Sequence, residues 1–253
     1  INPLKFVNGI AKYALSKNLK IFEHTKVDKI DKENGYYILK TKEGSIRSKK
    51  IVVATNGFYQ EGLIPQMDGR VLPVISNIIV TRKLNEDELN AHNFKTFSPI
   101  ANTKNLLYYY RKLPDNRILF GTRGDLTGSD QSNLAMSKKM EKFLKNIFPK
   151  WSNVTIDYNW RGLIALSQKL TPSIGKIDNE EIYYGFGYNG VGVSAAPWTG
   201  KQLSKLVFSS NSKELDISKI YKGLPKKFIF PQLRTFYFRL AVWFYAIKDK
   251  LNI

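Results

Sequence analysis

The sequence predicts an α/β fold with an added antiparallel sheet (α+β), and three stretches lead to this prediction. Residues 1–57 have the order helix, strand, β-ribbon and apolar strand, which is typical of the second half of a nucleotide-binding α/β domain. Residues 71–168 contain long aromatic strands with a hairpin. Residues 181–208 return to a strand, a glycine-rich loop and a helix. We expect an α/β domain from residues 1–70 and 169–210, a sheet domain from 71–168, and a helical tail from 211–253.

Composition limits the classes of function. With 253 residues, of which 43% are hydrophobic, the chain is long enough for one large or two modest globular domains. The absence of cysteine excludes disulfides and thiolate chemistry, and two histidines leave little from which to build a metal site, so none is expected. The net charge of +19 permits binding to RNA or to anionic membranes, which stays as an alternative of another class. The lysines are scattered beside Asn and Glu, however, as on a solvated surface, and we expect no nucleic-acid partner.

The first residues predict a helix. Asn2 is a favourable N-cap, Pro3 fits the first helical position, and apolar residues recur at helical spacing up to Asn18. Alternating and apolar runs then predict strands at residues 19–24, 35–41, 45–47 and 51–57, the last one fully buried.

The two ends of the chain carry further expectations. The chain starts at Ile1 without an initiator Met or targeting segment, so we expect a missing N-terminal segment or a partner chain to complete it. It has no apolar run of about 18 residues, and a cytoplasmic location is expected. The aromatic and basic segment Pro231–Leu251 favours either peripheral membrane contact or packing on protein.

The middle of the chain predicts a sheet with helices. A strand is expected at 73–82, a short acidic helix at 85–92, a hairpin from 106–112 and 117–123, a long strand at 153–168 and a turn at 171–175. A helix over Ser132–Phe148 is expected to turn five apolar side chains inward: Leu134, Met140, Phe143, Leu144 and Ile147.

The glycine-rich stretch links a strand to a helix at Ser194–Phe208. Gly185, Gly187 and Gly190 satisfy G-x-G-x-x-G, a dinucleotide-binding pattern. A strand, a glycine loop and a helix N-terminus together direct backbone N–H groups and a positive dipole end at an electron-rich ligand.

Several stretches, in this order, carry a resemblance to a known family. They are Asn2-Pro3-Leu4 through Gly9, Glu23-x-Thr25-x-Val27-x-x-Ile30, Val53-Ala54-Thr55-Asn56-Gly57, and Trp160-x-Gly162 with Pro172-x-Ile174-Gly175 leading to Gly187-Tyr188-Asn189-Gly190-x-Gly192. Together they resemble the FAD-dependent oxidoreductases of the D-amino-acid oxidase/glycine oxidase family, nearest the gamma-glutamylputrescine oxidase-like branch. Each stretch alone is a weak signal, and their order and spacing make the resemblance specific.

The resemblance implies FAD as cofactor and assigns its contacts. Val27 would present its main chain to the adenine, and Ala54, Thr55, Asn56 and Gly57 would lie near the pyrophosphate and ribityl chain. The loop Gly187, Tyr188, Asn189, Gly190, Val191 and Gly192 would lie by the isoalloxazine ring, with the following helix aimed at its N1–C2=O edge. The G-x-G-x-x-G here would therefore hold the ring, while the pyrophosphate fingerprint belongs to the missing segment.

The positions at which this sequence differs from the family pattern also indicate the substrate class. Ile164 stands where amino-acid-oxidising relatives carry a carboxylate-binding Arg, and Gly190 stands where glycine oxidases carry a second one. Arg161 is no easy substitute, because a shift of three residues on a strand changes its face. We expect oxidation of a primary or secondary amine, gamma-glutamylputrescine-like or amino-acid-derived, to an imine by hydride transfer to flavin N5. A D-amino-acid dehydrogenase or glycine oxidase is the alternative.

A substrate pocket of aromatic and basic side chains is expected in the sheet domain. Its candidates are Tyr108, Tyr109, Tyr110, Arg123 and Trp160, with Ile164 at the substrate end. The plainer interpretations are core faces of strands for the aromatic residues and a surface charge for Arg123. No catalytic acid or base is assigned, because flavin-dependent amine oxidation needs orientation and a dry pocket more than proton transfer from the protein.

Overall fold

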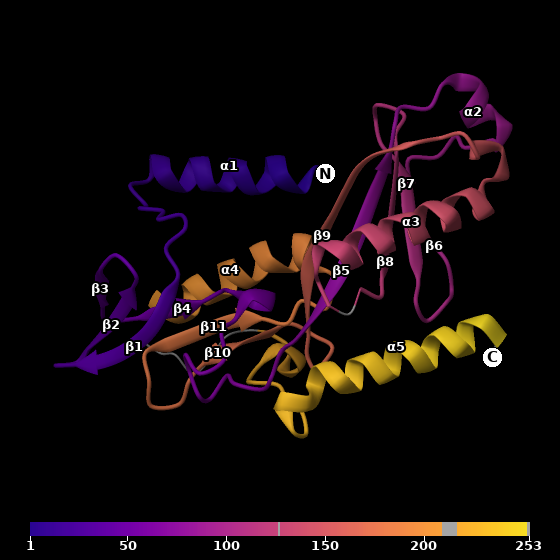
Figure 1. The fold of residues 1–253 in the computed structure, drawn as a ribbon. Coiled ribbons are helices and arrows are strands. Elements are labelled where there is room, and N and C mark those ends of the chain that lie inside the picture. The colour runs from indigo at the N-terminus through magenta and orange to yellow at the C-terminus, as the bar shows by residue number, and fades with distance from the viewer. Residues whose placement is uncertain (126, 209–216, 252–253) are drawn as a thin grey trace. The chain divides into compact units, whose positions relative to one another are not determined.

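The computed structural model describes residues 1–125, 127–208 and 217–251 (Figure 1). Contacts between Cα atoms divide the chain into two compact units, Ile1–Val71 with Ser167–Lys227 and Leu72–Leu166 with Phe228–Ile253. The boundary expected between residues 210 and 211 lies outside the described residues. The roles expected for the two parts, cofactor binding and substrate binding, stay predictions.

The first unit begins with helix α1 (Pro3–Ser16), as predicted. The side chain of Asn2 accepts a hydrogen bond of 3.0 Å from the backbone N–H of Lys5, and Pro3 occupies the first turn. None of the residues of α1 is buried. The strand predicted at residues 19–24 is wrong. His24 has a left-handed backbone (φ 55°), which ends any extended run, and pairing starts only at Val27.

Sheet A of this unit is an antiparallel meander of β1 (Val27–Glu33), β2 (Tyr36–Thr41) and β3 (Ser45–Ser48). Strand β1 was not predicted, because five of its seven residues are charged, as on a solvated surface. Asn34 and Gly35 join β1 to β2 with positive φ values of 49° and 77°, the backbone that a tight Asn-Gly hairpin turn requires.

Sheet B has the order β10–β11–β4. Strands β4 (Ile51–Val53) and β11 (Ile182–Phe186) are parallel, and β10 (Ser173–Lys176) pairs antiparallel with β11. Helix α4 (Gly192–Phe208) contacts β10 and β11. The buried residues between them are Ile174, Tyr183, Leu203 and Leu206.

Two predictions fail in sheet B. The turn expected at residues 171–175 is mostly strand, because the backbone from Ser173 pairs with β11. The last strand of the N-terminal part is shorter than expected and is not fully buried. It ends at Val53, and the side chain of Val52 is 46% exposed because strand residues alternate between faces.

The second unit is built on sheet C, which has the order β6–β7–β8–β5–β9 and is antiparallel throughout. The predicted hairpin and both long strands are confirmed. The strands are β5 (Leu72–Thr81), β6 (Ile100–Ala101), β7 (Tyr108–Lys112), β8 (Ile118–Arg123) and β9 (Ile156–Leu166).

Two helices pack near sheet C. The predicted acidic helix is α2 (Glu86–Ala91), which starts with a capping box formed by Asn85 and Glu88. Helix α3 (Asp130–Ile147) contacts β5, β8 and β9. Its buried side chains are Met136, Met140 and Leu144, which recur at intervals of four residues and join a core with Ile79, Ile118, Phe120 and Trp151.

The inward face predicted for α3 is partly wrong. Leu134 is 58% exposed and Ile147 is 40% exposed, whereas Met136, which was not predicted, is buried. Leu134 lies two positions before Met136, on the other side of the helix from the buried row.

The chain ends in helix α5 (Arg234–Leu251), which has no buried residue. The carboxylate of Asp249 accepts hydrogen bonds from the backbone N–H groups of Asn105 (2.9 Å) and Leu106 (2.8 Å), which tie this helix to the loop before β7. In the part of the chain that the structure describes, no helix is long and apolar enough to cross a membrane.

Short 3₁₀ turns complete the two units. They are η1 (Asn56–Phe58), η2 (Pro149–Trp151), η3 (Lys219–Tyr221) and η4 (Pro231–Leu233).

Candidate functional site

The two loops predicted to hold the cofactor leave sheet B at the same edge. Ile51 lies opposite Ile182 and Val53 opposite Tyr184 in the parallel β4–β11 pair. The chain after β4 and the chain after β11 therefore both start from the carboxyl ends of neighbouring strands. Open α/β sheets bind ligands at this edge.

A side-chain hydrogen bond joins these loops directly. Asn56, with a left-handed backbone (φ 48°), accepts a hydrogen bond of 3.0 Å through its Oδ1 from the backbone N–H of Gly187. Gly187 itself has φ 76°, a conformation that favours glycine. The side-chain amide of Asn56 thus holds together two residues that are 131 positions apart in the chain. Both were predicted from the sequence as cofactor contacts.

Asn189 fixes the shape of the glycine loop. Its backbone is also left-handed (φ 51°), its Oδ1 accepts a hydrogen bond of 3.1 Å from the backbone N–H of Ser167, and its Nδ2 donates to the carbonyl of Gly187. The backbone N–H of Val191 donates to the carbonyl of Tyr188 at 2.9 Å and closes the turn. The loop is therefore shaped by its own side chains and backbone.

Tyr188 lies beneath this loop rather than on its surface. It is 8% exposed, its hydroxyl is 3.4 Å from the carbonyl oxygen of Gly185, and its burial raises its pKa. Among the predicted cofactor contacts, this side chain supports the loop from the protein side.

The exposed part of the site is backbone at the start of α4. The helix begins at Gly192, and Gly190 and Val191 before it are exposed, as are Ala54 and Thr55 on the neighbouring loop. The first N–H groups of a helix have no partner within the helix and lie at its positive end. This set of donors fits the electron-rich edge of a flavin ring, so the residues present are compatible with FAD.

Gly185, the first glycine of the G-x-G-x-x-G pattern, has a packing role. A Cβ atom there would lie 2.5 Å from Cγ2 of Thr199 and 2.8 Å from Cδ1 of Leu203, both on α4. The glycine lets the helix approach β11 closely, which is a different requirement from binding phosphate.

Val27, the predicted adenine contact, lies on sheet A. It is half-buried, pairs with Thr41 and precedes an irregularity in the register at Asp28. Sheet A is tied to the β10–β11 loop through Tyr37, whose hydroxyl donates to Glu180 and accepts from the backbone N–H of Glu181 at 2.8 Å. Among the described residues, no hydrogen bond joins Val27 to the loops that follow β4 and β11.

The predicted substrate-pocket residues divide between the two faces of sheet C. Arg123 lies opposite Ser76, Trp160 lies opposite Ile78, and Ile164 lies opposite Val74. Because Ser76, Ile78 and Val74 alternate along β5, their partners Arg123, Trp160 and Ile164 share one face. We call this the arginine face of sheet C.

Tyr108 and Tyr110 lie on the opposite face. Their rings stack on Phe120 with centroids 5.6 and 6.0 Å away, and both pack against the core beneath α3. Burial, with a smaller effect of Asp249, raises the pKa of Tyr108 to about 12. Tyr109 lies on the arginine face instead, where its hydroxyl shares a hydrogen bond of 2.9 Å with Ser76. The alternation was evident in the sequence, but which tyrosine faces the core was not.

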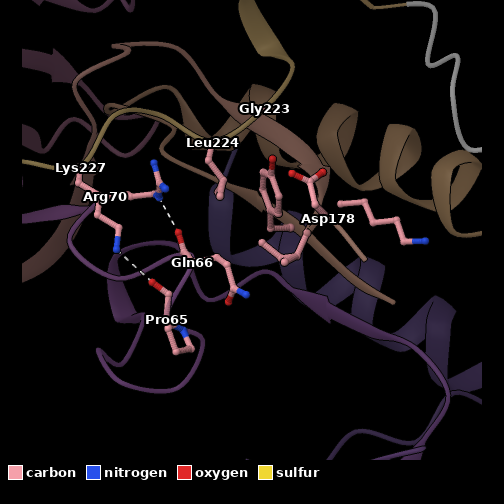
Figure 2. A pocket seen from close by; sticks show the side chains of 10 residues that line it. Pro65, Gln66, Arg70, Asp178, Gly223, Leu224 and Lys227 are labelled. Carbon is pink, nitrogen blue, oxygen red and sulfur yellow. Dashed lines mark hydrogen bonds between the residues drawn. The ribbon is translucent and has the colours of Figure 1, made fainter. Parts of the chain in front are cut away.

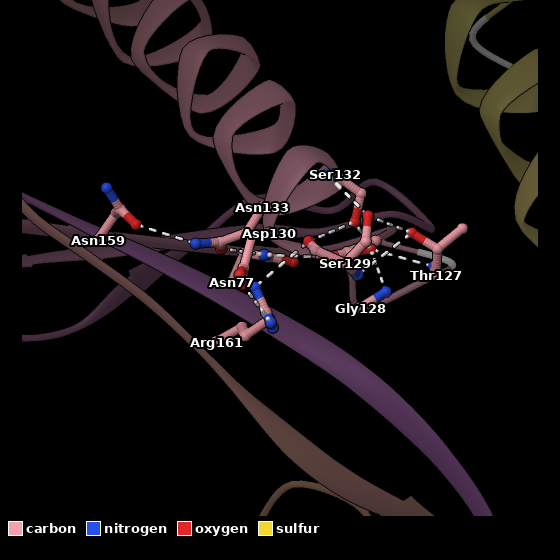
Figure 3. Close-up of polar contacts among 10 residues, drawn as sticks. Asn77, Thr127, Gly128, Ser129, Asp130, Ser132, Asn133, Asn159 and Arg161 are labelled. Carbon is pink, nitrogen blue, oxygen red and sulfur yellow. Dashed lines mark hydrogen bonds and ion pairs between the residues drawn. The ribbon is translucent and has the colours of Figure 1, made fainter.

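Arg161 points away from the arginine face, as expected from its position. Its guanidinium donates to Asp130 at 3.0 Å and to the carbonyl of Ser129, at the N-terminus of α3 (Figure 3).

The sequence reasoning missed a polar cluster beside this end of α3. Asp125 is 3% exposed and accepts hydrogen bonds from the hydroxyl of Ser132 (2.6 Å) and the backbone N–H of Gly128 (3.0 Å). Burial by itself raises the pKa of Asp125, but these hydrogen bonds outweigh it and hold the pKa below its usual range. Asn77 and Asn133 continue the cluster to Asn159 (Figure 3). Each member is hydrogen-bonded to at least one other member, which indicates a structural role, and Oδ1 of Asn77 is buried without a partner.

The first unit also contains a pocket of about 650 Å³ (Figure 2). Its cations are occupied within the protein: Arg70 donates to the carbonyls of Gln66 and Pro225, and Lys227 donates to the carbonyl of Pro65. The pocket contains none of the predicted cofactor contacts. Among the described residues, no three acidic or histidine side chains are arranged to hold a metal ion.

Comparison with known proteins agrees with the geometry of sheet B. Residues 1–206 match the model of the family described as FAD dependent oxidoreductase (DAO). The chain is 28% identical to a probable oxidoreductase OrdL of Haemophilus influenzae, over 99% of this chain and 56% of that protein. It is 27% identical to the gamma-glutamylputrescine oxidoreductase of Escherichia coli, over 100% of this chain and 58% of that protein.

Solved structures share the fold. An L-proline dehydrogenase from P. horikoshii superposes with a TM-score of 0.65 at 22% identity, over 84% of this chain and 57% of that one. A glycine oxidase from Geobacillus kaustophilus also gives 0.65, at 17% identity, over 85% of this chain and 55% of that one. The chain thus spans somewhat more than half the length of these relatives. Because the family match covers most of the chain, the chain belongs to the DAO family of FAD-dependent oxidoreductases, and FAD is its cofactor.

Proposed function

We propose that the protein oxidises a primary or secondary amine, gamma-glutamylputrescine-like or derived from an amino acid, to the corresponding imine. The observation that carries the proposal is the hydrogen bond between Asn56 Oδ1 and the backbone N–H of Gly187, at the carboxyl edge of the parallel β4–β11 pair. It joins the two loops whose backbone would hold the flavin. The gamma-glutamylputrescine oxidoreductase relative supports an amine as the substrate class.

Bound FAD would supply the two-electron acceptor for the hydride that leaves the carbon beside the amine nitrogen. The chain's own residues bind and orient. The N-terminal amides of α4 offer hydrogen bonds and a positive dipole where negative charge would accumulate, and Asn56 and Asn189 keep the loop in place. The amine must lose a proton from nitrogen to become an imine, and water is a sufficient acceptor for it.

Among the described residues, the hydrogen bonds that join the loops on sheet B use no acid–base side chain. The side chains that form these bonds are Asn56 and Asn189, whose amides do not titrate near neutral pH, and Ser167 contributes only its backbone N–H. The proposal therefore assigns no catalytic acid or base.

Two further parts of the proposal concern the complete protein. We propose that a segment outside this chain, either N-terminal or from a partner chain, binds the remainder of FAD, since the relatives are longer. We also propose a cytoplasmic location.

Anaerobic mixing of the flavin-loaded protein with single amines tests the function. Putrescine derivatives, N-methylated amines and D-amino acids would be added in turn, and the visible absorbance of oxidised flavin followed. Loss of this absorbance with one imine formed per flavin is the expected result. A flavin that no amine bleaches would contradict the proposal.

The same panel separates the alternative reaction. A D-amino-acid dehydrogenase or glycine oxidase would respond to glycine or D-amino acids and not to putrescine derivatives. Fold likeness to a glycine oxidase alone does not decide between them, because structures at such identity share architecture without sharing substrates.

A further inference from the structure

Arg123 is a half-buried guanidinium without a partner. Its Nε is buried and forms no hydrogen bond, and among the described residues no carboxylate or carbonyl pairs with any of its nitrogens. A cation that is partly removed from water loses hydration, and the loss is normally offset by an anion or by hydrogen-bond acceptors.

Three other arginines of the second unit do have such partners. Arg82 pairs with Glu88 at 2.6 Å, Arg117 with Asp157 at 2.5 Å, and Arg161 with Asp130 at 3.0 Å. These three guanidinium groups are satisfied by ion pairs within the second unit, whereas that of Arg123 is not.

The surroundings of Arg123 offer further polar groups and free space. Ser76 lies opposite it on β5, and the Ser76 hydroxyl shares a hydrogen bond of 2.9 Å with the hydroxyl of Tyr109. On the far side of Ser76, across β5, lies Gly162 of β9, where an added Cβ atom would meet nothing within 4 Å. Trp160, two residues before Gly162 on the same face, is 46% exposed.

Arg111 provides an internal comparison. It lies on the same face of β7 and its Nε is also buried without a partner. Its neighbours across the sheet are apolar, however: Leu119 lies opposite it, and Val80, which is 4% exposed, lies opposite Leu119. Arg123 differs from Arg111 in its neighbours. Beside Arg123 lie the hydroxyl groups of Ser76 and Tyr109, and Gly162 follows across β5.

We propose that Arg123 binds a carboxylate of the substrate on the arginine face of sheet C, with the Ser76–Tyr109 hydroxyl pair beside it and the open floor at Gly162 receiving the rest of the molecule. A planar guanidinium pairs with a carboxylate through two parallel hydrogen bonds, which fixes orientation as well as adding affinity. The substrate class is then an amine that also carries an acid group. In this proposal the acid group binds Arg123 on β8. It does not bind at the position of Ile164 on β9, where this chain has an apolar residue.

This inference rests on the proposed function, and its test uses pairs of amines that differ only in the acid. Glycine is compared with methylamine, sarcosine with dimethylamine, and 4-aminobutyrate with butylamine, each by anaerobic flavin reduction and by steady-state kinetics. The variants are Arg123→Gln, Arg123→Lys and, as the matched control, Arg111→Gln. Propionate, which has the acid and no amine, serves as a competitive probe of the anion site.

For at least one pair, the acid-bearing amine is expected to be the better substrate. Arg123→Gln should lower its kcat/KM by about 10- to 100-fold, mainly through KM, because a hydrogen-bonded charge is lost. Inhibition by propionate should disappear in the same variant. Arg123→Lys should recover part of the loss, since a point charge replaces the planar group. Arg111→Gln should stay within about twofold of the wild type.

The outcomes separate this inference from the proposed function. If no amine reduces the flavin, the proposed function fails. If amines reduce it equally with and without the acid, or if Arg111→Gln and Arg123→Gln weaken acid-bearing substrates alike, the function stands and the role of Arg123 is wrong. Thermal melting of each variant, with the activity on the acid-free amine of the pair, shows that a loss is not due to unfolding.

Discussion

At the residue scale, the close packing of α4 on β11 requires glycine at position 185. Replacing it by Ala would place a methyl group 2.5 Å from Cγ2 of Thr199, so α4 would have to move away from β11. We expect Gly185→Ala to lower the free energy of unfolding by about 1–3 kcal/mol, the range for overpacked cores, as measured by urea denaturation.

Gly200 on the same helix is the matched control for Gly185. An added Cβ atom there meets nothing within 4 Å, and Ala is the better helix former, so Gly200→Ala should be neutral or stabilising by up to about 1 kcal/mol. Equal destabilisation by both changes would contradict the packing explanation.

Glu88 predicts a pH dependence of stability. Its carboxylate binds Arg82 at 2.6 Å and the backbone N–H of Asn85 at 3.0 Å, and the ion pair with Arg82, more than the bond to Asn85, lowers its pKa from 4.5 to about 2. A carboxyl whose pKa falls on folding stabilises the protein above its ordinary pKa. This stabilisation is lost as pH falls through the folded value.

We therefore expect Glu88→Gln to cost about 1 kcal/mol at pH 7, since the pair is partly exposed and screened. The difference from the wild type should shrink as pH falls from about 4.5 toward about 2, in urea denaturation at each pH. Asp87→Asn, an exposed carboxylate in the same helical turn, is the control. A difference that stays constant with pH would rule out the ionic contribution.

At the element scale, α5 presents an apolar stripe to its surroundings. Phe236, Leu240, Trp243 and Phe244 lie at helical spacing and are each at least 50% exposed. The flanking basic residues are Arg239, Lys248 and Lys250. Phe238, Val242 and Tyr245 lie on the other side of the helix, so its apolar residues occupy more than one face.

We propose that this stripe contacts an anionic membrane surface. Vesicles of phosphatidylglycerol should co-sediment the protein, and vesicles of phosphatidylcholine should do so about tenfold less. Added salt and the double change Trp243→Ala with Phe244→Ala should each weaken binding. Equal co-sedimentation with both kinds of vesicle would contradict this proposal. It would favour packing of the stripe on protein, which was the second expectation from the sequence.

The elements that the sequence predicted well are those with strong local signals. Helix α2 has its capping box, β7 and β8 have a turn at Asp115–Asn116, and β5 and β9 have long apolar runs. Strands β1 and β10 were missed because β1 is highly charged, while β10 follows Pro172 and contains Ser173 and Gly175, which look like a turn. Their pairing comes from neighbours distant in the chain.

The candidate site was predicted to a similar extent. The motifs located both loops of sheet B, but not the Asn56–Gly187 hydrogen bond between them, which depends on how β4 and β11 pair. Alternation showed that Tyr108 and Tyr109 differ, but only the position of α3 shows which face is core. Burial of Arg123 without a partner depends on the packed sheet and has no signal in the sequence.

At the scale of the whole molecule, the chain interleaves two compact units, and each contributes a candidate site built from residues of that unit alone. The first holds the loops at the carboxyl edge of sheet B, and the second holds the arginine face of sheet C. The chain spans 56–58% of the length of its curated relatives, so the proposed activity belongs to the complete protein.

The central claim is that the loops joined by Asn56 and Gly187 hold the flavin. The most direct test is the affinity of the complete protein for FAD, measured by equilibrium dialysis, in wild type and in Asn56→Gly, which keeps the left-handed backbone and removes the amide. The account predicts about tenfold weaker binding, the effect of about one lost hydrogen bond. Asn34→Gly, at a turn with a similar φ in sheet A, should bind as the wild type does. FAD affinity that is unchanged in Asn56→Gly would contradict the account.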